Sequence, residues 1–183
     1  HRCGLTPDDD IADYSSADQV QTCELLNLAD LDTSSAPVRD RLREYLLKGG
    51  FLWVDDFWGP WAMEAFADEI AKALPRATYP IQEIEPGHPI YSALFPVAAI
   101  PQVPSIQFWR GSGGDTSEMG EYSAKAHMAA ISDPHGRIMV LMTHNTDIAD
   151  AWEREAEDPR FFYLFSPNGY AVGINILLYA MTH

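Results

Sequence analysis

The spacing of apolar residues in the first half of the chain predicts a helix, a strand and a second helix. Val38, Leu42 and Leu46 share one helical face between a Ser-Ser-Ala-Pro start and a Gly-Gly stop. The apolar run Phe51-Leu52-Trp53-Val54 is typical of a strand covered on both faces. We therefore expect a helix over 34–50, a strand over 51–54 and a helix over 59–74 that Pro75 stops.

The second half has the pattern of short strands followed by helices. Asp133-Pro134-His135-Gly136 has turn chemistry, which predicts a hairpin between strands over 124–131 and 137–142. Further strands are expected over 20–28, 79–84 and 106–109, and an acidic helix near 149–157. Asn168 is expected to cap a last helix whose buried face holds Ile174, Leu177, Leu178 and Met181.

This order of elements predicts a three-layer α/β fold, with a mostly parallel central sheet and helices on both faces. Residues 1–23 are expected to form an acidic N-terminal arm, and residues 24–183 a single domain. Ligands of such sheets lie beyond the carboxyl ends of the strands. The loops 55–59 and 144–150 are expected at that edge.

Composition indicates a globular domain and argues against two functional classes. The 183 residues are 46% hydrophobic, which is enough for one domain with a substantial core. A formal net charge of −15 argues against nucleic-acid binding, because phosphate contacts need clustered Lys and Arg. The longest strongly apolar run is shorter than the roughly 20 residues of a membrane helix, so no transmembrane span is expected. Cys3 and Cys23 are too few for a disulfide framework and leave a single disulfide as an open alternative.

Negative charge is concentrated in two stretches. Residues 1–32 hold eight acids against one arginine, and residues 145–160 hold six acids against two arginines. Each stretch is either a solvated face or a surface for a cation or a basic partner.

Short motifs follow one another in a fixed order along the chain. They are Gly49-Gly50-Phe51-Leu52-Trp53-Val54-Asp55-Asp56-Phe57-Trp58-Gly59, Gly87-His88-Pro89-Ile90, Pro101-Gln102-Val103-Pro104, Gly136-Arg137-Ile138-Met139-Val140-Leu141, His144-Asn145-Thr146-Asp147 and the ending from Gly173-Ile174-Asn175 to Thr182-His183. From about residue 24 onward the chain resembles the bacterial domain of unknown function 4159 family. That family is similar to the class I glutamine amidotransferase-like superfamily, which includes the trehalose-utilisation (ThuA-like) proteins. The resemblance implies a flavodoxin-like, amidotransferase-like domain and no established reaction.

The sequence departs from the active amidotransferases in two places. Their nucleophilic Cys follows the strand after the paired glycines, and here Asp55-Asp56 stands on that turn, with no Gly-x-Ser-x-Gly elbow. Classical glutaminase activity is therefore not expected. Family members also carry a strand and a helix ahead of position 24, for which residues 1–23 are too short and too polar. Another protein chain is accordingly expected to cover a sheet edge or to dock on the acidic arm.

Asp55 and Asp56 are the first candidate site residues, because they end a strand at the ligand-facing edge. Neighbouring side chains on an extended chain point opposite ways, so only one of them can face a pocket. In the functional interpretation, that residue acts as ligand acceptor, general base or metal ligand. In the structural alternative, one aspartate caps the next helix and the other bonds backbone groups of the turn. We expect the pair to face the segment that begins with His144 across a crevice.

The loop 144–150 supplies the second group of candidates. These are His144, Asn145, Asp147 and Asp150. His144 and Asp147 are the candidates for holding a divalent metal, but no fixed ligand spacing supports one, and no cofactor is predicted. The alternative is a loop tied together by its own Asn and Asp side chains.

Three more residues complete the predicted ligand site. His88 is held extended by Pro89, and Trp58 and Trp152 lie beside the expected crevice, where a ring can stack on a sugar or a partner side chain. The simpler alternatives are a rigid turn for His88 and core packing for the two tryptophans.

Two functions follow from these candidates. The favoured one is a non-catalytic module that binds a ligand or assembles a protein complex. The alternative is a hydrolase-type enzyme for a sugar-like or small polar substrate. It would use Asp55 or Asp56 together with His144, either with or without a metal ion. The non-Met start and the acidic surface favour a periplasmic or otherwise exported protein, with the cytoplasm as the alternative.

Overall fold

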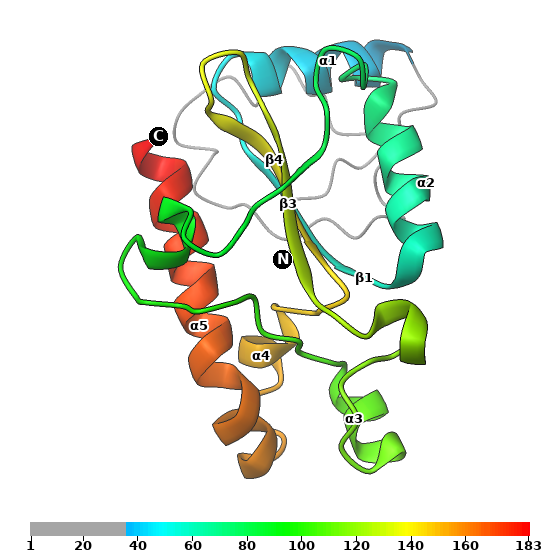
Figure 1. The fold of residues 1–183 in the computed structure, drawn as a ribbon, viewed down its shortest axis with the longest axis vertical. Coiled ribbons are helices and arrows are strands. Elements are labelled where there is room, and N and C mark those ends of the chain that lie inside the picture. Colours follow the sequence, from blue (N-terminus) through cyan, green and yellow to red (C-terminus); the bar gives the residue numbers. More distant parts are fainter. Residues whose placement is uncertain (1–35) are drawn as a thin grey trace.

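The computed structural model describes residues 36–183 (Figure 1). The expected arm, the strand over 20–28 and both cysteines lie outside the described residues. The described elements are α1 (Ala36–Leu47), β1 (Leu52–Phe57), α2 (Gly59–Ala71), β2 (Gln82–Glu83), the 3-10 turn η4 (Pro89–Ser92), α3 (Ile106–Ser112), the 3-10 turn η5 (Gly120–Ser123), β3 (His127–Ser132), β4 (Ile138–His144), α4 (Asp150–Glu153) and α5 (Pro159–Thr182).

The four strands form one mixed sheet in the order β1-β4-β3-β2. Only β1 and β4 are parallel, whereas β3 runs antiparallel to both of its neighbours. The expectation of a mostly parallel sheet is therefore wrong. The cause is the tight turn at Asp133 to Gly136, because a connection this short can join only antiparallel strands.

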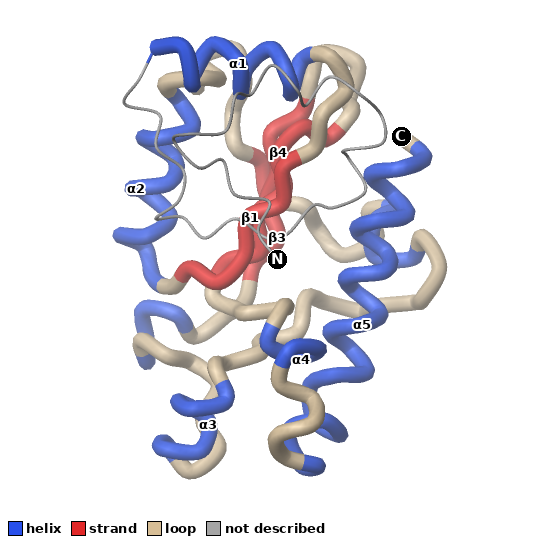
Figure 2. The backbone as a smooth tube through the Cα atoms, turned by 180° about the vertical axis from the view of Figure 1, so that it is seen from behind, coloured by secondary structure: helices blue, strands red, loops and turns tan. Residues whose placement is uncertain are grey.

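Apolar side chains gather in two clusters on opposite faces of the sheet. Met128 and Ala130 of β3 belong to the cluster under α5, and Ala129 and Ile131 belong to the cluster under α1 and α2. This alternation is the period of two that a strand imposes on its side chains. Figure 2 shows the strands passing between α2 on one side and α5 on the other, with α1 across the end at which β1 begins.

Two predicted strands differ in the structure. Residues 106–109 are helical in α3, because the Ser105 hydroxyl accepts a hydrogen bond from the Phe108 N–H and Gly113 ends the helix with φ of 81°. The strand predicted over 79–84 is reduced to β2 at the sheet edge, although the Ile84 N–H still bonds the Met128 carbonyl. Local capping outweighed the strand-like composition of 106–109.

The last helix is longer than expected and buries a different face. It begins at Pro159 with Asp158 as its cap, so Asn168 lies inside it. Leu177 and Met181, expected to be buried, are 54% and 74% exposed, while Val172 and Ile176 pack in the core. The predicted face was wrong because this helix is apolar on both sides, and spacing alone does not say which side meets the sheet.

By length and composition alone, α5 also reaches the range of a membrane-crossing helix. Its most apolar window is 44% buried inside the protein, as in the core helix of a globular domain. This is too weak to identify a transmembrane span.

Candidate functional site

Asp55 joins the end of β1 to the segment that follows β4. Its carboxylate accepts one hydrogen bond from the Thr143 hydroxyl and another from the Ala149 N–H at 3.0 Å. The side chain is 3% exposed, and this burial raises the pKa of Asp55 to about 7, against the two donors that favour the charged form. Both oxygens of Asp55 are therefore engaged within the chain.

Asp56, the next residue, is exposed. Its φ is 57°, in the left-handed region, at an irregularity of the β1–β4 register between Val54 and Phe57. The Trp58 indole donates to its carboxylate at 3.1 Å. Partial burial, and then the nearby charges of Glu118 and Asp150, raise the pKa of Asp56. Asp56 is thus the carboxylate of the pair that a ligand can reach.

Asn145 holds the two loops together from a buried position. Its amide oxygen accepts from the Gly59 N–H at 2.8 Å, and its amide nitrogen donates to the Lys125 carbonyl at 2.9 Å. Its φ is 60°, a conformation that Asn adopts more readily than most residues. This residue fits the alternative of a loop tied by its own side chains.

His144 ends β4 between two other rings. Its Nε2 bonds the Gly59 carbonyl at 2.9 Å, which identifies that nitrogen as the protonated one in this contact. Its ring lies 4.9 Å from the ring of Phe57 and stacks at 6.0 Å on His127. Burial lowers the pKa of His144, an effect that the bond to Gly59 partly opposes.

Asp147 and Asp150 continue the acidic cluster into the start of α4. Asp147 accepts from the Asp150 N–H at 2.9 Å, and Asp150 accepts from the Ile106 N–H at 3.2 Å. Burial, followed by the charges of Asp55, Asp56 and Asp150, raises the pKa of Asp147 to about 9. Arg154 bonds Asp150 at 3.4 Å and compensates part of this negative charge.

The expected meeting of the two loops is present in the structure. Besides the Asp55 contact with Ala149, the Asp56 N–H bonds the Thr146 carbonyl at 3.2 Å. The two loops touch, so hydrogen bonds join them where a crevice was expected. A surface depression that the structure does show lies along α1, and its lining residues are Asp40, Arg43, Glu44, Leu47 and Lys48.

His88 and Trp152 have other surroundings. His88 caps η4 by accepting from the Ile90 N–H, and its ring lies 5.3 Å from Tyr179 of α5. Trp152 packs between Trp53 and Tyr170, at 6.2 and 6.1 Å. The contacts of both residues correspond to the simpler alternatives, a turn and core packing.

The metal candidates do not form a ligand set in this part of the chain. Within residues 36–183, no three His, Cys, Asp or Glu side chains converge in a way that could hold a metal ion. His144 faces the Gly59 carbonyl, while Asp147 faces the first turn of α4.

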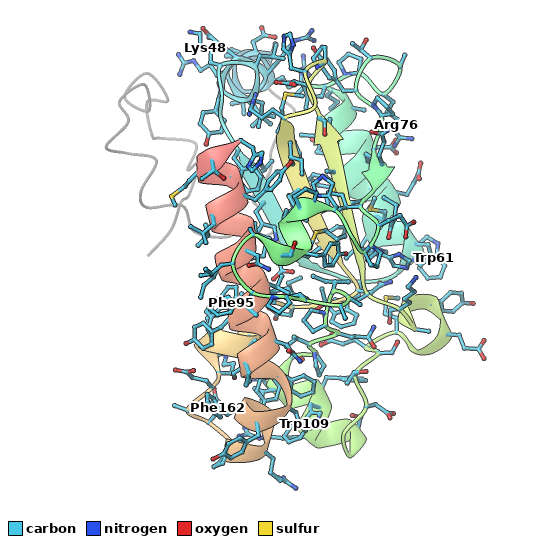
Figure 3. All side chains as sticks on the ribbon, turned by 60° about the vertical axis from the view of Figure 1, so that its left-hand side comes forward. Lys48, Trp61, Arg76, Phe95, Trp109 and Phe162 are labelled. Carbon is cyan, nitrogen blue, oxygen red and sulfur yellow. The ribbon has the colours of Figure 1, made fainter. Side chains whose placement is uncertain are left out.

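An exposed aromatic pair near the start of α2 was not anticipated. Trp61 of α2 and Tyr122 of η5 are 61% and 63% exposed, with ring centroids 5.0 Å apart. Met119 and the ring of Trp61 both approach the backbone of Gly59. Figure 3 shows Trp61 on the outer side of the molecule. We call the surface formed by Asp56, Trp58, Trp61, Glu118, Met119 and Tyr122 the β1-end surface.

The sequence held a weak signal for this surface. Trp61 stands off the apolar stripe of its helix, and Tyr122 lies in a Gly-rich polar loop. Nothing in the linear sequence brings these two residues together.

A family model matches residues 27–181, which span the described elements from α1 through all but the last residue of α5. Over that segment the chain matches the domain of unknown function DUF4159, and it belongs to that family.

Proposed function

We propose that this domain is a non-catalytic binding module that recognises a cationic group of a ligand or partner at the β1-end surface. The observation that carries the proposal is the difference in burial and bonding between the neighbouring aspartates Asp55 and Asp56. Asp55 is buried with both oxygens bonded inside the chain, whereas Asp56 is exposed beside aromatic rings.

The internal bonding of the other candidates supports a non-catalytic role. A general base must come within hydrogen-bonding distance of a substrate proton. Asn145 is bonded to Gly59 and Lys125, and the Nε2 of His144 is bonded to the Gly59 carbonyl. These side chains stabilise the junction of the two loops, so catalysis would require several of these bonds to break first.

Charge and ring geometry support a cationic occupant. The pKa of Asp56 is raised in part by Glu118 and Asp150, which means that negative charges crowd this edge. A cation relieves that repulsion, and exposed Trp and Tyr faces attract a guanidinium or ammonium group. Trp61 and Tyr122, with ring centroids 5.0 Å apart near the start of α2, offer such faces.

The proposal includes a relation to the amidotransferase-like superfamily. The parallel pairing of β1 with β4 and the positive φ of Asp56 at the strand end support it. In this view Asp55-Asp56 occupies the turn that carries a nucleophile elsewhere, and the turn has become a recognition surface.

Binding of acetyl-hexaarginine amide, followed by tryptophan fluorescence and titration calorimetry, tests the proposed function. Asp56→Asn and Trp61→Ala should each weaken binding about 3- to 10-fold, the range expected for one exposed ion pair or cation–π contact. Asp40→Asn on α1, at the other end of the molecule, removes the same charge and should leave the affinity unchanged. Hexaglutamate should not bind.

Two results would overturn this function. One is the absence of hexaarginine binding at low ionic strength. The other is an equal loss of affinity in Asp40→Asn and Asp56→Asn, which would indicate attraction by net charge alone.

A further inference from the structure

The outer face of α5 carries an apolar stripe along the whole helix. Tyr163 is 77% exposed, Leu177 54% and Met181 74%, although all three are large apolar or aromatic residues. The opposite face, with Phe161, Val172 and others, is buried in the core. We call the stripe the α5 seam, and its residues are Tyr163, Pro167, Tyr170, Ile174, Leu177 and Met181.

The α5 seam has the spacing of a coiled-coil interface. Its residues follow one another at intervals of 4, 3, 4, 3 and 4, which is the heptad pattern that keeps one face toward a partner helix. Residues 161–182 contain no Asp, Glu, Lys or Arg, so α5 is uncharged beyond Arg160 in a chain of net charge −15. Exposed apolar stripes of this extent mark interaction sites.

The intervals are also the same in both directions along the helix. A second α5 that runs antiparallel therefore meets the first with every seam residue in register. Tyr163 then faces Met181 of the partner subunit, Pro167 faces Leu177 of the partner subunit, and Tyr170 faces Ile174 of the partner subunit. The sulfur of methionine packs favourably on aromatic rings.

We propose that the α5 seam joins two copies of this chain as an antiparallel, two-fold helix pair. This surface is separate from the β1-end surface, and the proposal does not depend on the proposed function. The occupant is a second copy because another α5 offers the same uncharged face, and antiparallel pairing sets each Tyr or Pro of the seam against a Met, Leu or Ile of the other copy.

The placement of charge favours the antiparallel direction. Glu157 and Asp158 come just before α5, with Glu153 and Glu155 ahead of them, and Arg154 and Arg160 offset part of this negative charge. A 24-residue helix is about 36 Å long, several times the screening length of about 8–10 Å at physiological salt. Antiparallel pairing therefore keeps the two acidic ends apart, whereas parallel pairing brings them together.

Neighbouring apolar residues widen the contact. Leu94 and Phe95 are 58% and 41% exposed, and their N–H groups bond Asn175 at 2.9 Å, which fixes them against α5. Figure 3 shows Phe95 against α5. A helix of five turns or more with such a border is of the size that buries about 800 Å² per partner in standard interfaces.

A lipid surface fits the same face less well. Helices that lie on membranes carry Lys and Arg along their polar side, and anionic lipids attract positive charge. The far side of α5 is buried in the protein core, and the chain as a whole is strongly negative.

Sedimentation equilibrium of the full chain tests the proposal. We expect a dimer whose dissociation constant rises at least about 10-fold in Leu177→Glu. Leu164→Glu is the matched control, because Leu164 is 57% exposed on the same helix but lies off the seam. It should dimerise like the unchanged chain, and circular dichroism should show both variants folded.

Crosslinking tests the direction in a background with Cys3→Ser and Cys23→Ser. A mixture of Tyr163→Cys and Met181→Cys chains should form a covalent heterodimer under mild oxidation. Tyr163→Cys alone should not crosslink, because antiparallel pairing holds the two copies of that position far apart.

Three outcomes would overturn the proposal. The first is a chain that stays monomeric at about 100 µM. The second is efficient crosslinking of Tyr163→Cys with itself. The third is equal dimerisation of Leu177→Glu and Leu164→Glu. Cosedimentation of the unchanged chain with phosphatidylcholine vesicles, lost in Leu177→Glu, would assign the seam to lipid instead.

Discussion

The amide oxygen of Asn145 accepts a hydrogen bond from the backbone N–H of Gly59, 2.8 Å away, and so fixes the start of α2 to the end of β4. The same side chain donates to the Lys125 carbonyl ahead of β3. One buried amide therefore connects three segments that are remote in sequence. It acts together with the bonds from the Ala149 N–H to Asp55 and from the Asp56 N–H to Thr146.

Replacement of Asn145 by Ala should lower the free energy of unfolding by about 2–4 kcal/mol, because it leaves a buried donor and a buried acceptor without partners. Asn168→Ala, an exposed position in α5, should change it by less than about 0.5 kcal/mol. Urea denaturation followed by circular dichroism measures both. Equal effects would contradict the role assigned to Asn145.

Asp147 should make stability fall as the pH rises. Its pKa of about 9 in the folded state lies above that of the unfolded chain, so the folded protein binds the extra proton. The stability from this group is fully present below the unfolded pKa and is lost as the pH rises through about 9. The stability from Asp55 is likewise lost as the pH rises through its pKa of about 7. The pKa of His144 is lowered, so the stability from His144 is lost as the pH falls below about 6.5.

Asp147→Asn keeps the acceptor for the Asp150 N–H and removes the titration. Between pH 7 and 9 its melting temperature should therefore stay nearly constant, while that of the unchanged chain declines. At pH 8 the variant should be more stable by about 1 kcal/mol or more. Differential scanning fluorimetry across this range is the measurement, and parallel curves for the two proteins would refute the assignment.

Gly169 should not tolerate Ala, although Ala favours helices. A Cβ at this position would lie 2.3 Å from the Ala151 Cβ, so α4 and α5 would have to separate. The overpacking cost of about 1–3 kcal/mol exceeds the gain in helix propensity of up to about 1 kcal/mol. Gly111→Ala, where nothing lies within 4 Å of the added Cβ, should be neutral or stabilising. Thermal unfolding distinguishes the two, and a stabilised Gly169→Ala would show that α4 moves freely.

Arg137 should be sensitive even to Lys. Its guanidinium donates to the Leu46 carbonyl at 2.6 Å and the Gly50 carbonyl at 2.9 Å, and it bonds Asp133 at 3.2 Å. Lys lacks this planar set of donors, so Arg137→Lys should cost about 1–2 kcal/mol. Arg41→Ala, on the exposed side of α1, should cost less than about 0.5 kcal/mol. Denaturation of these two variants side by side is the check.

Local signals predicted the elements whose ends are chemically marked. The glycines at 49 and 50 ended α1, and the turn at Asp133 to Gly136 placed the hairpin of β3 and β4. The same turn implies that β3 and β4 are antiparallel, which conflicts with the expectation of a mostly parallel sheet. The prediction of a strand over Ile106 to Trp109 was wrong because β-branched and aromatic residues favour strands, whereas capping by Ser105 stabilises a helix here.

The candidate site was predictable only in outline. The position of Asp55 and Asp56 at the end of a strand followed from the apolar run before them, and their contact with the loop after β4 is present. Which of the two faces solvent depended on the register of β1, and the approach of Trp61 to Tyr122 depended on tertiary packing. The outward face of α5 was ambiguous because Leu177 and Ile176 are equally apolar.

The central hairpin has one further consequence for how the molecule loses its structure. Met139 and Leu141 of β4 lie in different hydrophobic clusters, as do Ala129 and Ala130 of β3. Because β3 and β4 supply side chains to both clusters, the loss of one cluster also removes packing that holds these strands against the other. Heat should therefore disrupt both faces in a single cooperative event, with equal calorimetric and van't Hoff enthalpies.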